Sequence, residues 1–140
     1  IKRYTRKISG PLLDRIDIHV HVPRVKYEDM TSVAKAESSA AIRERVLAAR
    51  EIQMERLREW GIFCNAQMSH AILKKTCILE PEAQNLLAQA FQVMNLSARS
   101  YDRIIKVART IADLDGAATI EAKHVGEAIQ LRDDVGLNVE

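Results

Sequence analysis

This sequence of 140 residues lacks the motifs that hold a nucleotide in phosphate-loop enzymes. No Gly-x-x-x-x-Gly-Lys-Ser/Thr loop occurs anywhere in it, and no apolar run ends in an Asp-Glu pair that would bind magnesium. Because such enzymes need both elements to place the phosphates and the metal, the chain cannot hydrolyse ATP alone.

Aromatic residues and cysteines are also scarce. Aromatic residues make up 4% of the chain, so its core must be aliphatic. The two cysteines, Cys64 and Cys77, have no second pair nearby, which argues against a Cys-x-x-Cys zinc site and a disulfide framework. His19 and His21 alternate along one segment but lack a third ligand at metal-binding spacing. We therefore expect reduced thiols, solvated histidines and no metal site.

Long apolar runs and an excess of one charge are absent as well. No run approaches the roughly 20 apolar residues that cross a bilayer, and no signal peptide opens the chain. We therefore expect a cytoplasmic location without membrane contact. A net charge of +2 gives no strong electrostatic case for nucleic acid, so partner choice must come from local patches.

Amphipathic helical patterns dominate the rest of the chain. The segments have serine, threonine or proline at their starts and glycine at several ends, as helix boundaries do. The predicted helices cover residues 38–60, 68–76, 80–94, 97–115 and 119–132. In the first of them, the apolar stripe comprises Ile42, Val46, Ala49, Ile52 or Gln53, and Leu57, and Arg56 is among the charged residues on the exposed side. Their short links predict an all-α fold, an antiparallel bundle of four to five helices.

One segment ahead of the bundle has a different period. Residues 16–22 alternate apolar and polar side chains until Pro23, which predicts a β-strand with one apolar face. No second strand follows, so we expect an orphan strand that is loose or has a makeshift partner. Residues 24–37 are interpreted as a linker, and we expect disorder in residues 1–7 and in the 133–140 tail.

Arg99 occupies an unusual position in the first turn of the most amphipathic helix. Ser97 is suited to cap this helix, and Arg99 lies off its apolar stripe. The first turn has unpaired backbone N–H groups and a partial positive charge, and a guanidinium adds a bidentate phosphate donor to them. This position therefore predicts a contact between Arg99 and a phosphate.

Two segments resemble the magnesium-chelatase-like AAA+ ATPases of bacteria. Residues 9–17, Ser-Gly-Pro-Leu-Leu-Asp-Arg-Ile-Asp, resemble the arginine-finger segment at the end of an AAA+ core. Residues 97–114, which begin Ser-Ala-Arg-Ser-Tyr-Asp-Arg, resemble the sensor 2 motif of the helical lid. The resemblance covers most of residues 8–132 and implies a C-terminal piece of a longer ATPase, inactive alone.

The resemblance also implies roles for single residues. Arg15 would be the arginine finger that reaches the active site of a neighbouring subunit. Arg99, with Ser97 and Ala98 beside it, would be sensor 2 and would contact the ATP held by its own core. ATP and Mg²⁺ would be cofactors of the full-length protein only. Its partners would be the missing AAA+ core and neighbouring subunits of a homo-oligomeric ring.

The same resemblance implies a division of the chain into three parts. These are the end of the AAA+ core at 1–30, the helical lid at 31–132 and the disordered tail at 133–140. The work that hydrolysis drives stays open between metal insertion, DNA remodelling and a chaperone-like task.

Simpler interpretations compete with these roles. Arg99 could be solvated or pair with Asp102 or Asp113, and Arg15 could pair with Asp14 or Asp17. The alternative function is a helical nucleic-acid-binding module in which Arg99, Arg103 and Lys106 grip a phosphate backbone from one helix face. The nearly balanced charge argues against that alternative.

Overall fold

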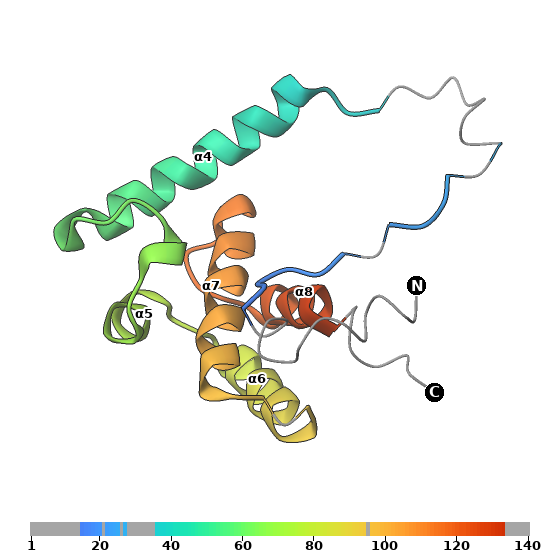
Figure 1. Ribbon diagram of the computed structural model, residues 1–140. Coiled ribbons are helices and arrows are strands. Elements are labelled where there is room, and N and C mark those ends of the chain that lie inside the picture. Colours follow the sequence, from blue (N-terminus) through green and yellow to red (C-terminus); the bar gives the residue numbers. More distant parts are fainter. Residues whose placement is uncertain (1–14, 21, 26, 28–35, 95, 134–140) are drawn as a thin grey trace.

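Five α-helices account for most of the residues that the computed structural model describes, which are 15–20, 22–25, 27, 36–94 and 96–133 (Figure 1). They are α4 (Ser39–Leu57), α5 (His70–Thr76), α6 (Pro81–Val93), α7 (Ala98–Leu114) and α8 (Ala122–Asp133). Two short 3₁₀ turns, η1 (Arg58–Trp60) and η2 (Asn65–Gln67), join α4 to α5. The predicted all-α bundle is confirmed. The segment 1–7 and all of the 133–140 tail except Asp133 lie outside the described residues.

The helix boundaries follow the chemistry of their end residues. Ser69 and Ser97 cap α5 and α7, since their hydroxyl oxygens accept hydrogen bonds from the backbone N–H groups of Ile72 and Ser100. Pro81 opens α6, where its missing N–H is not needed. Gly116 follows α7 with a φ of 68°, in the left-handed region that favours glycine. These predicted boundaries are confirmed.

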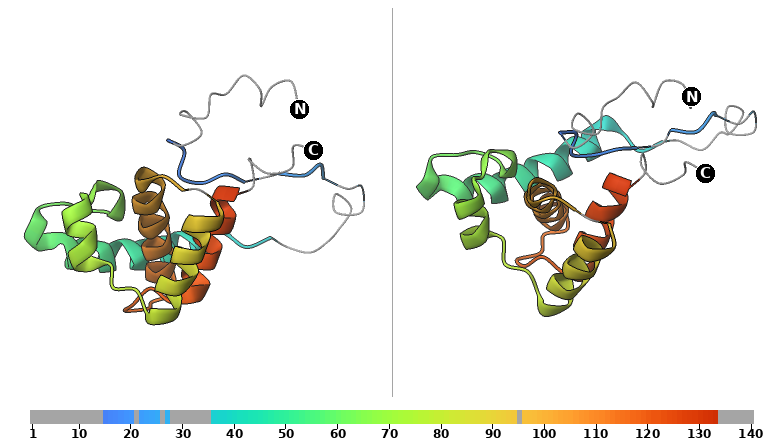
Figure 2. Two further views of the ribbon diagram at one scale, coloured as in Figure 1. Left: turned by 90° about the horizontal axis from the view of Figure 1, so that it is seen from below. Right: turned by 60° about the horizontal axis from the view of Figure 1, so that its bottom comes forward.

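Helix α7 lies at the centre of the bundle and contacts α4, α5 and α8, while α6 packs on α8. The right-hand view of Figure 2 looks nearly along α7 and shows the other helices around it. Its buried stripe mixes isoleucine with alanine, and the alanines allow close approach of the neighbouring helices. The main apolar core comprises Leu57, Met68, Leu73, Cys77, Ala83, Leu87, Ile104, Ile105, Ala108, Ala112, Ile120, Val125 and Ala128.

A parallel β-bridge between Leu79 and Ile120 connects two of the interhelical links. The backbone N–H of Ile120 donates to the carbonyl of Ile78 (2.8 Å), and the N–H of Glu80 donates to the carbonyl of Ile120 (3.0 Å). The link before α6 is thereby fastened to the link before α8.

The N-terminal half of α4 projects away from the other helices (Figure 1). Sequence pattern placed Ile42 and Val46 on a core-facing stripe, but they are 44% and 43% exposed. Ala49, Gln53 and Leu57 are the buried residues of α4. The stripe prediction is therefore wrong for the first turns of α4, because Ile42 and Val46 border an open hollow beside α7 and α8 and are not packed in the core.

The predicted strand over residues 16–22 does not form in the described part of that segment. The segment instead makes a backbone contact with α8, in which the N–H of His19 donates to the carbonyl of Leu131 (2.6 Å). The His19 ring also lies against α8, with Nδ1 3.1 Å from the carbonyl oxygen of Arg132, so this histidine is not simply solvated. His21 lies outside the described residues. No neighbouring strand is present in the described ranges, so the segment has no partner for the backbone hydrogen bonds of a β-sheet.

Candidate functional site

Arg99 stands in the first turn of α7 with its side chain exposed. The Ser97 hydroxyl occupies the cap position and also bonds the Ser100 hydroxyl (3.0 Å), which fixes the backbone around it. Ser97 and Ala98 are exposed too. Within the described part of the chain, the Arg99 guanidinium has no hydrogen bond or ion pair, so its donors are available to an outside acceptor.

Both carboxylates that could have paired with Arg99 are engaged elsewhere. Asp102 lies 2.7 Å from Nδ1 of His70 on α5. Asp113 lies in the interior, where it binds Arg56 and Arg109. The interpretation of Arg99 as a partner of either aspartate is therefore wrong in this structure.

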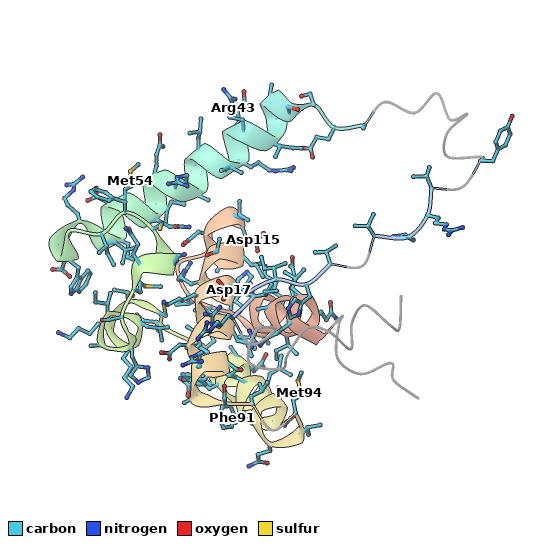
Figure 3. The ribbon with its side chains drawn as sticks, viewed as in Figure 1. Asp17, Arg43, Met54, Phe91, Met94 and Asp115 are labelled. Carbon is cyan, nitrogen blue, oxygen red and sulfur yellow. The ribbon has the colours of Figure 1, made fainter. Side chains whose placement is uncertain are left out.

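Two hollows meet at Arg99. The larger, about 1220 Å³, runs between α5, α6 and α7, and its apolar lining includes Leu79, Phe91 and Tyr101. The rings of Phe91 and Tyr101 meet edge to face with centroids 6.3 Å apart, and Figure 3 labels Phe91 on α6. The smaller hollow, about 550 Å³, lies between α7, α8 and the segment that contains Asp17.

The segment that carries Arg15 is attached to α7 by Arg103. Nη1 of Arg103 donates to the backbone carbonyl of Arg15 (2.5 Å) and also pairs with the carboxylate of Asp17. Figure 3 labels Asp17 in front of α7. The side chain of Arg15 is exposed and has no partner in the described ranges. Asp17 therefore pairs with Arg103 and not with Arg15, while Asp14 lies outside those ranges.

The basic residues after Arg99 on α7 are occupied within the protein. Lys106 donates from Nζ to the carbonyl of Ala66 (3.1 Å), and Arg103 holds the segment with Asp17. The next basic residue, Arg109, is only 1% exposed. Arg99, Arg103 and Lys106 do not form an unoccupied basic row, which weakens the nucleic-acid alternative.

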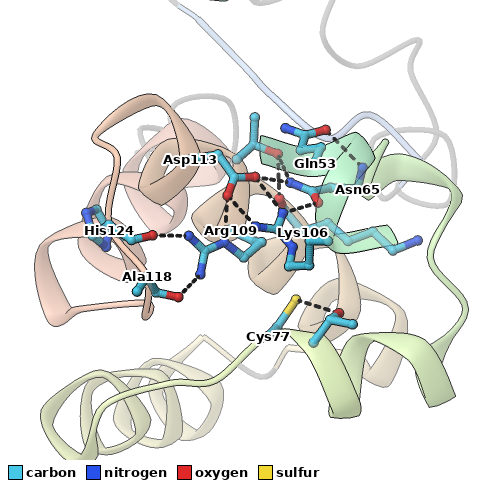
Figure 4. Close-up of polar contacts among 12 residues, drawn as sticks. Gln53, Asn65, Cys77, Lys106, Arg109, Asp113, Ala118 and His124 are labelled. Atoms are coloured by element: carbon cyan, nitrogen blue, oxygen red, sulfur yellow. Dashed lines mark hydrogen bonds and ion pairs between the residues drawn. The ribbon is translucent and has the colours of Figure 1, made fainter. Parts of the chain in front are cut away.

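A buried ionic cluster at the C-terminal half of α7 was not found by sequence reasoning (Figure 4). Both carboxylate oxygens of Asp113 lie 2.7 Å from the guanidinium nitrogens of Arg56, and one also accepts from Nε of Arg109 (3.0 Å). Asn65 donates to the same carboxylate (2.8 Å). Arg56 was expected on the exposed side of α4, and that expectation is wrong because its guanidinium turns toward Asp113.

The Arg109 guanidinium stabilises the link that follows α7. Its Nη1 and Nη2 donate to the carbonyls of Ala118 (2.9 Å) and Ala117 (2.5 Å) in the link after α7. Burial lowers the pKa of Arg109, and the Asp113 carboxylate opposes that shift. Each of its three nitrogens donates within the protein and the side chain is buried, so this arginine has a structural role.

The cysteines show no sign of reactive chemistry. Cys64 and Cys77 are both free thiols. Burial is the main cause that raises the pKa of Cys77, which disfavours the nucleophilic thiolate. Among the residues that the structure describes, no three His, Cys, Asp or Glu side chains gather as metal ligands.

Comparison with known protein families shows the family to which the chain belongs. Residues 36–132 match the family "Magnesium chelatase, subunit ChlI C-terminal", and residues 1–30 match "Magnesium chelatase, subunit ChlI". The chain belongs to the magnesium chelatase ChlI family. Its described helices therefore form the C-terminal domain of that family, as the resemblance implied.

Similar proteins occur in several bacteria. Competence protein ComM of Haemophilus influenzae is 39% identical over 94% of this chain. The uncharacterized protein YifB of Escherichia coli is 37% identical over 93% of it, and the uncharacterized protein Rv2897c of Mycobacterium tuberculosis is 36% identical over 94%. The chain spans only 25–26% of the length of these relatives.

In the described ranges, no helix of this family member is both long and apolar enough to cross a bilayer. The roles of Arg15, Ser97, Ala98 and Arg99 stay predictions, because a family match over whole segments does not test single side chains.

Proposed function

We propose that this chain is the helical lid of a magnesium-chelatase-like AAA+ ATPase, preceded by the end of the ATPase core. The two family matches support a division between the core segment, residues 1–30, and the lid, residues 31–132. The lid senses ATP in its own core and couples hydrolysis to motion in an oligomeric ring.

The observation that carries the proposal is the unpartnered guanidinium of Arg99 in the first turn of α7. A buried or paired arginine would have a structural role, as Arg109 does. An exposed one beside a capped helix N-terminus combines a bidentate donor with the positive end of the helix dipole. We infer that Arg99 binds the phosphate of the nucleotide and that the lid closes when the phosphate is present.

Family membership suggests ATP and Mg²⁺ in the full-length protein. The described residues fit the first of these, since Arg99 offers a cation for phosphate, with Ser97 and Ala98 at the same helix end. They do not fit a resident Mg²⁺, because no group of three ligands lies among them. We therefore assign the metal ligands to the core and derive no step of this lid through the metal.

Arg15 has the complementary role in this proposal. Its backbone is held against the lid while its side chain is exposed, so the guanidinium is available to a neighbouring subunit. An arginine supplied in trans stabilises charge on the transferring phosphoryl group and accelerates hydrolysis by about 10³-fold or more.

Substitution of Arg99 in the full-length protein tests the proposal. Arg99→Ala should reduce ATP turnover by about tenfold or more, because a phosphate-directed guanidinium is lost. Arg45→Ala is the matched control, since Arg45 also lies on an exposed helix surface, in an ion pair with Glu37 (2.7 Å). Unchanged turnover in Arg99→Ala would refute the sensor assignment.

The isolated chain provides a second test. It should bind ATP no better than about millimolar and show no turnover, because it lacks the phosphate loop and the metal-binding acids. Isothermal titration and a phosphate-release assay measure both quantities. Stoichiometric binding at micromolar ATP would show that the lid holds a nucleotide site of its own.

A further inference from the structure

Arg103 joins two parts of the molecule that the proposed function treats separately. Its Nη1 binds the backbone carbonyl of Arg15 and the carboxylate of Asp17, both in the segment before the lid. It lies on α7 four residues after Arg99, which is about one helical turn and 6 Å along the axis. The residue proposed to sense the nucleotide and the residue proposed as the finger are thus connected through one side chain.

The contact to Arg15 is made in a way that suits positioning. Arg103 donates to the main-chain oxygen of Arg15, and the guanidinium of Arg15 stays exposed. A second tie holds the same segment from α8, where the carbonyl of Leu131 accepts from the N–H of His19 (2.6 Å). The segment that carries the finger residue is therefore held by two lid helices, while the side chain of Arg15 stays exposed.

The contacts that Arg103 makes with Arg15 and Asp17 contribute little to the stability of the fold. The Arg103 side chain is 24% exposed and that of Asp17 is 55% exposed, and exposed ion pairs of this kind contribute little to folding. Arg103 also lies outside the buried cluster around Asp113 that ties α4 to α7. Its contacts join the segment with Arg15 to the lid, so its effect falls on the placement of that segment.

We propose that Arg103 is a positioning residue that fixes the backbone of Arg15 on the lid, an inference that rests on the proposed function. Loss of Arg103 displaces the finger that a subunit offers to its neighbour. It leaves the contact of Arg99 with the nucleotide of its own subunit in place.

Mixed rings distinguish this role from a local one. Arg99→Ala damages the site of its own subunit, whereas Arg103→Ala should damage only the site of the neighbour that receives the finger. Each single variant should lose about tenfold or more in turnover. In an equal mixture, one subunit junction in four pairs an undamaged site with an undamaged finger, so turnover should recover to about a quarter of wild type.

A second mixture gives the opposite expectation. Arg15→Ala and Arg103→Ala damage the same function, so mixing them should restore nothing. Arg45→Ala mixed with wild type controls for subunit exchange, and unchanged thermal unfolding of Arg103→Ala in the isolated chain controls for folding. Wild-type turnover of Arg103→Ala, or no recovery when it is mixed with Arg99→Ala, would overturn the proposal.

The mixture of Arg15→Ala with Arg99→Ala separates the two levels of inference. Recovery in this mixture, without recovery in the mixture of Arg99→Ala and Arg103→Ala, would remove the role of Arg103 and leave the proposed function in place. Failure of the mixture of Arg15→Ala and Arg99→Ala would remove the division of roles between sensor and finger itself.

Discussion

The two ends of α7 place an arginine in opposite surroundings. Arg99 in the first turn is exposed and has no partner in the described ranges, whereas Arg109, ten residues later, is 1% exposed and donates from each of its three nitrogens inside the protein. The sequence neighbours of the two residues look alike, since each has an aspartate three or four positions downstream. What differs is the element packed against each end.

This contrast shows how one helix can hold a structural charge and an available charge. The C-terminal half of α7 lies under α4, and the Arg56 side chain from α4 completes the cluster around Asp113. The N-terminal end borders two hollows, so nothing encloses Arg99. An arginine with the same helical propensity is therefore structural at one end and open to a ligand at the other.

Removal of Asp113 should have the largest effect on this comparison. Asp113→Ala leaves the Arg56 and Arg109 guanidiniums together without their shared anion, and loss of one buried partner costs about 3–5 kcal/mol. Urea unfolding of the isolated chain measures the loss. Asp115→Ala, two residues later and exposed, is the control and should cost much less. Equal losses in both variants would contradict the buried cluster.

Single substitutions of Arg109 and Arg99 compare the buried and the exposed arginine of α7 directly. Arg109→Ala should lower the free energy of unfolding by about 2–4 kcal/mol, because it opens a cavity and leaves the carbonyls of Ala117 and Ala118 without donors. Arg99→Ala should change it by no more than about 0.5 kcal/mol. Chemical unfolding of both variants under one condition is sufficient, and a large loss in Arg99→Ala would mean that its side chain supports the fold.

The salt dependence of DNA binding tests whether α7 can present its basic residues together. With Arg103 and Lys106 held by internal partners, Arg99 alone is available on this face, so the slope of log K against log salt should be about −1. Fluorescence titration with a labelled duplex at several salt concentrations measures it. A slope near −3 would show that all three cations leave the protein for phosphate, as the alternative function requires.

The smallest effect is expected at Asp115, the exposed residue that follows the C-terminal end of α7. A hydrogen bond from the Lys123 ammonium (2.6 Å) is the main cause that lowers the pKa of Asp115 below its usual 3.8. A lowered carboxyl pKa adds stability above the usual carboxyl range, and that stability disappears as the pH falls through the folded-state value. Lys123→Ala should raise the Asp115 pKa toward 3.8 in an NMR titration. A pKa that does not move would contradict this ion pair.

The parts of the fold that depend on local chemistry could be predicted from the sequence. Ser69, Ser97 and Pro81 start helices where their side chains satisfy or dispense with N–H groups, and Gly116 follows one in the left-handed conformation. These features need no knowledge of distant residues. The helix count and the all-α class followed from them.

The parts that depend on distant partners could not be predicted. Arg56 looked like a solvated residue on α4, because its partner Asp113 is remote in sequence and a helical pattern cannot show which carboxylate folds against it. Ile42 and Val46 fitted an apolar stripe, but periodicity does not say how far the neighbouring helix extends. The spacing of Arg109 and Asp113, four residues apart on α7, is the one local signal for the cluster.

The bridge between Leu79 and Ile120 has a consequence for how quickly the domain folds. Helices form from contacts that are close in sequence, whereas this bridge closes a loop that contains all of α6 and α7. The chain entropy of that closure is lost before the bridge hydrogen bonds compensate for it, unless α6, α7 and α8 have already packed. We therefore expect the bridge to form after the main folding barrier, so substitutions that weaken it accelerate unfolding and leave the refolding rate almost unchanged.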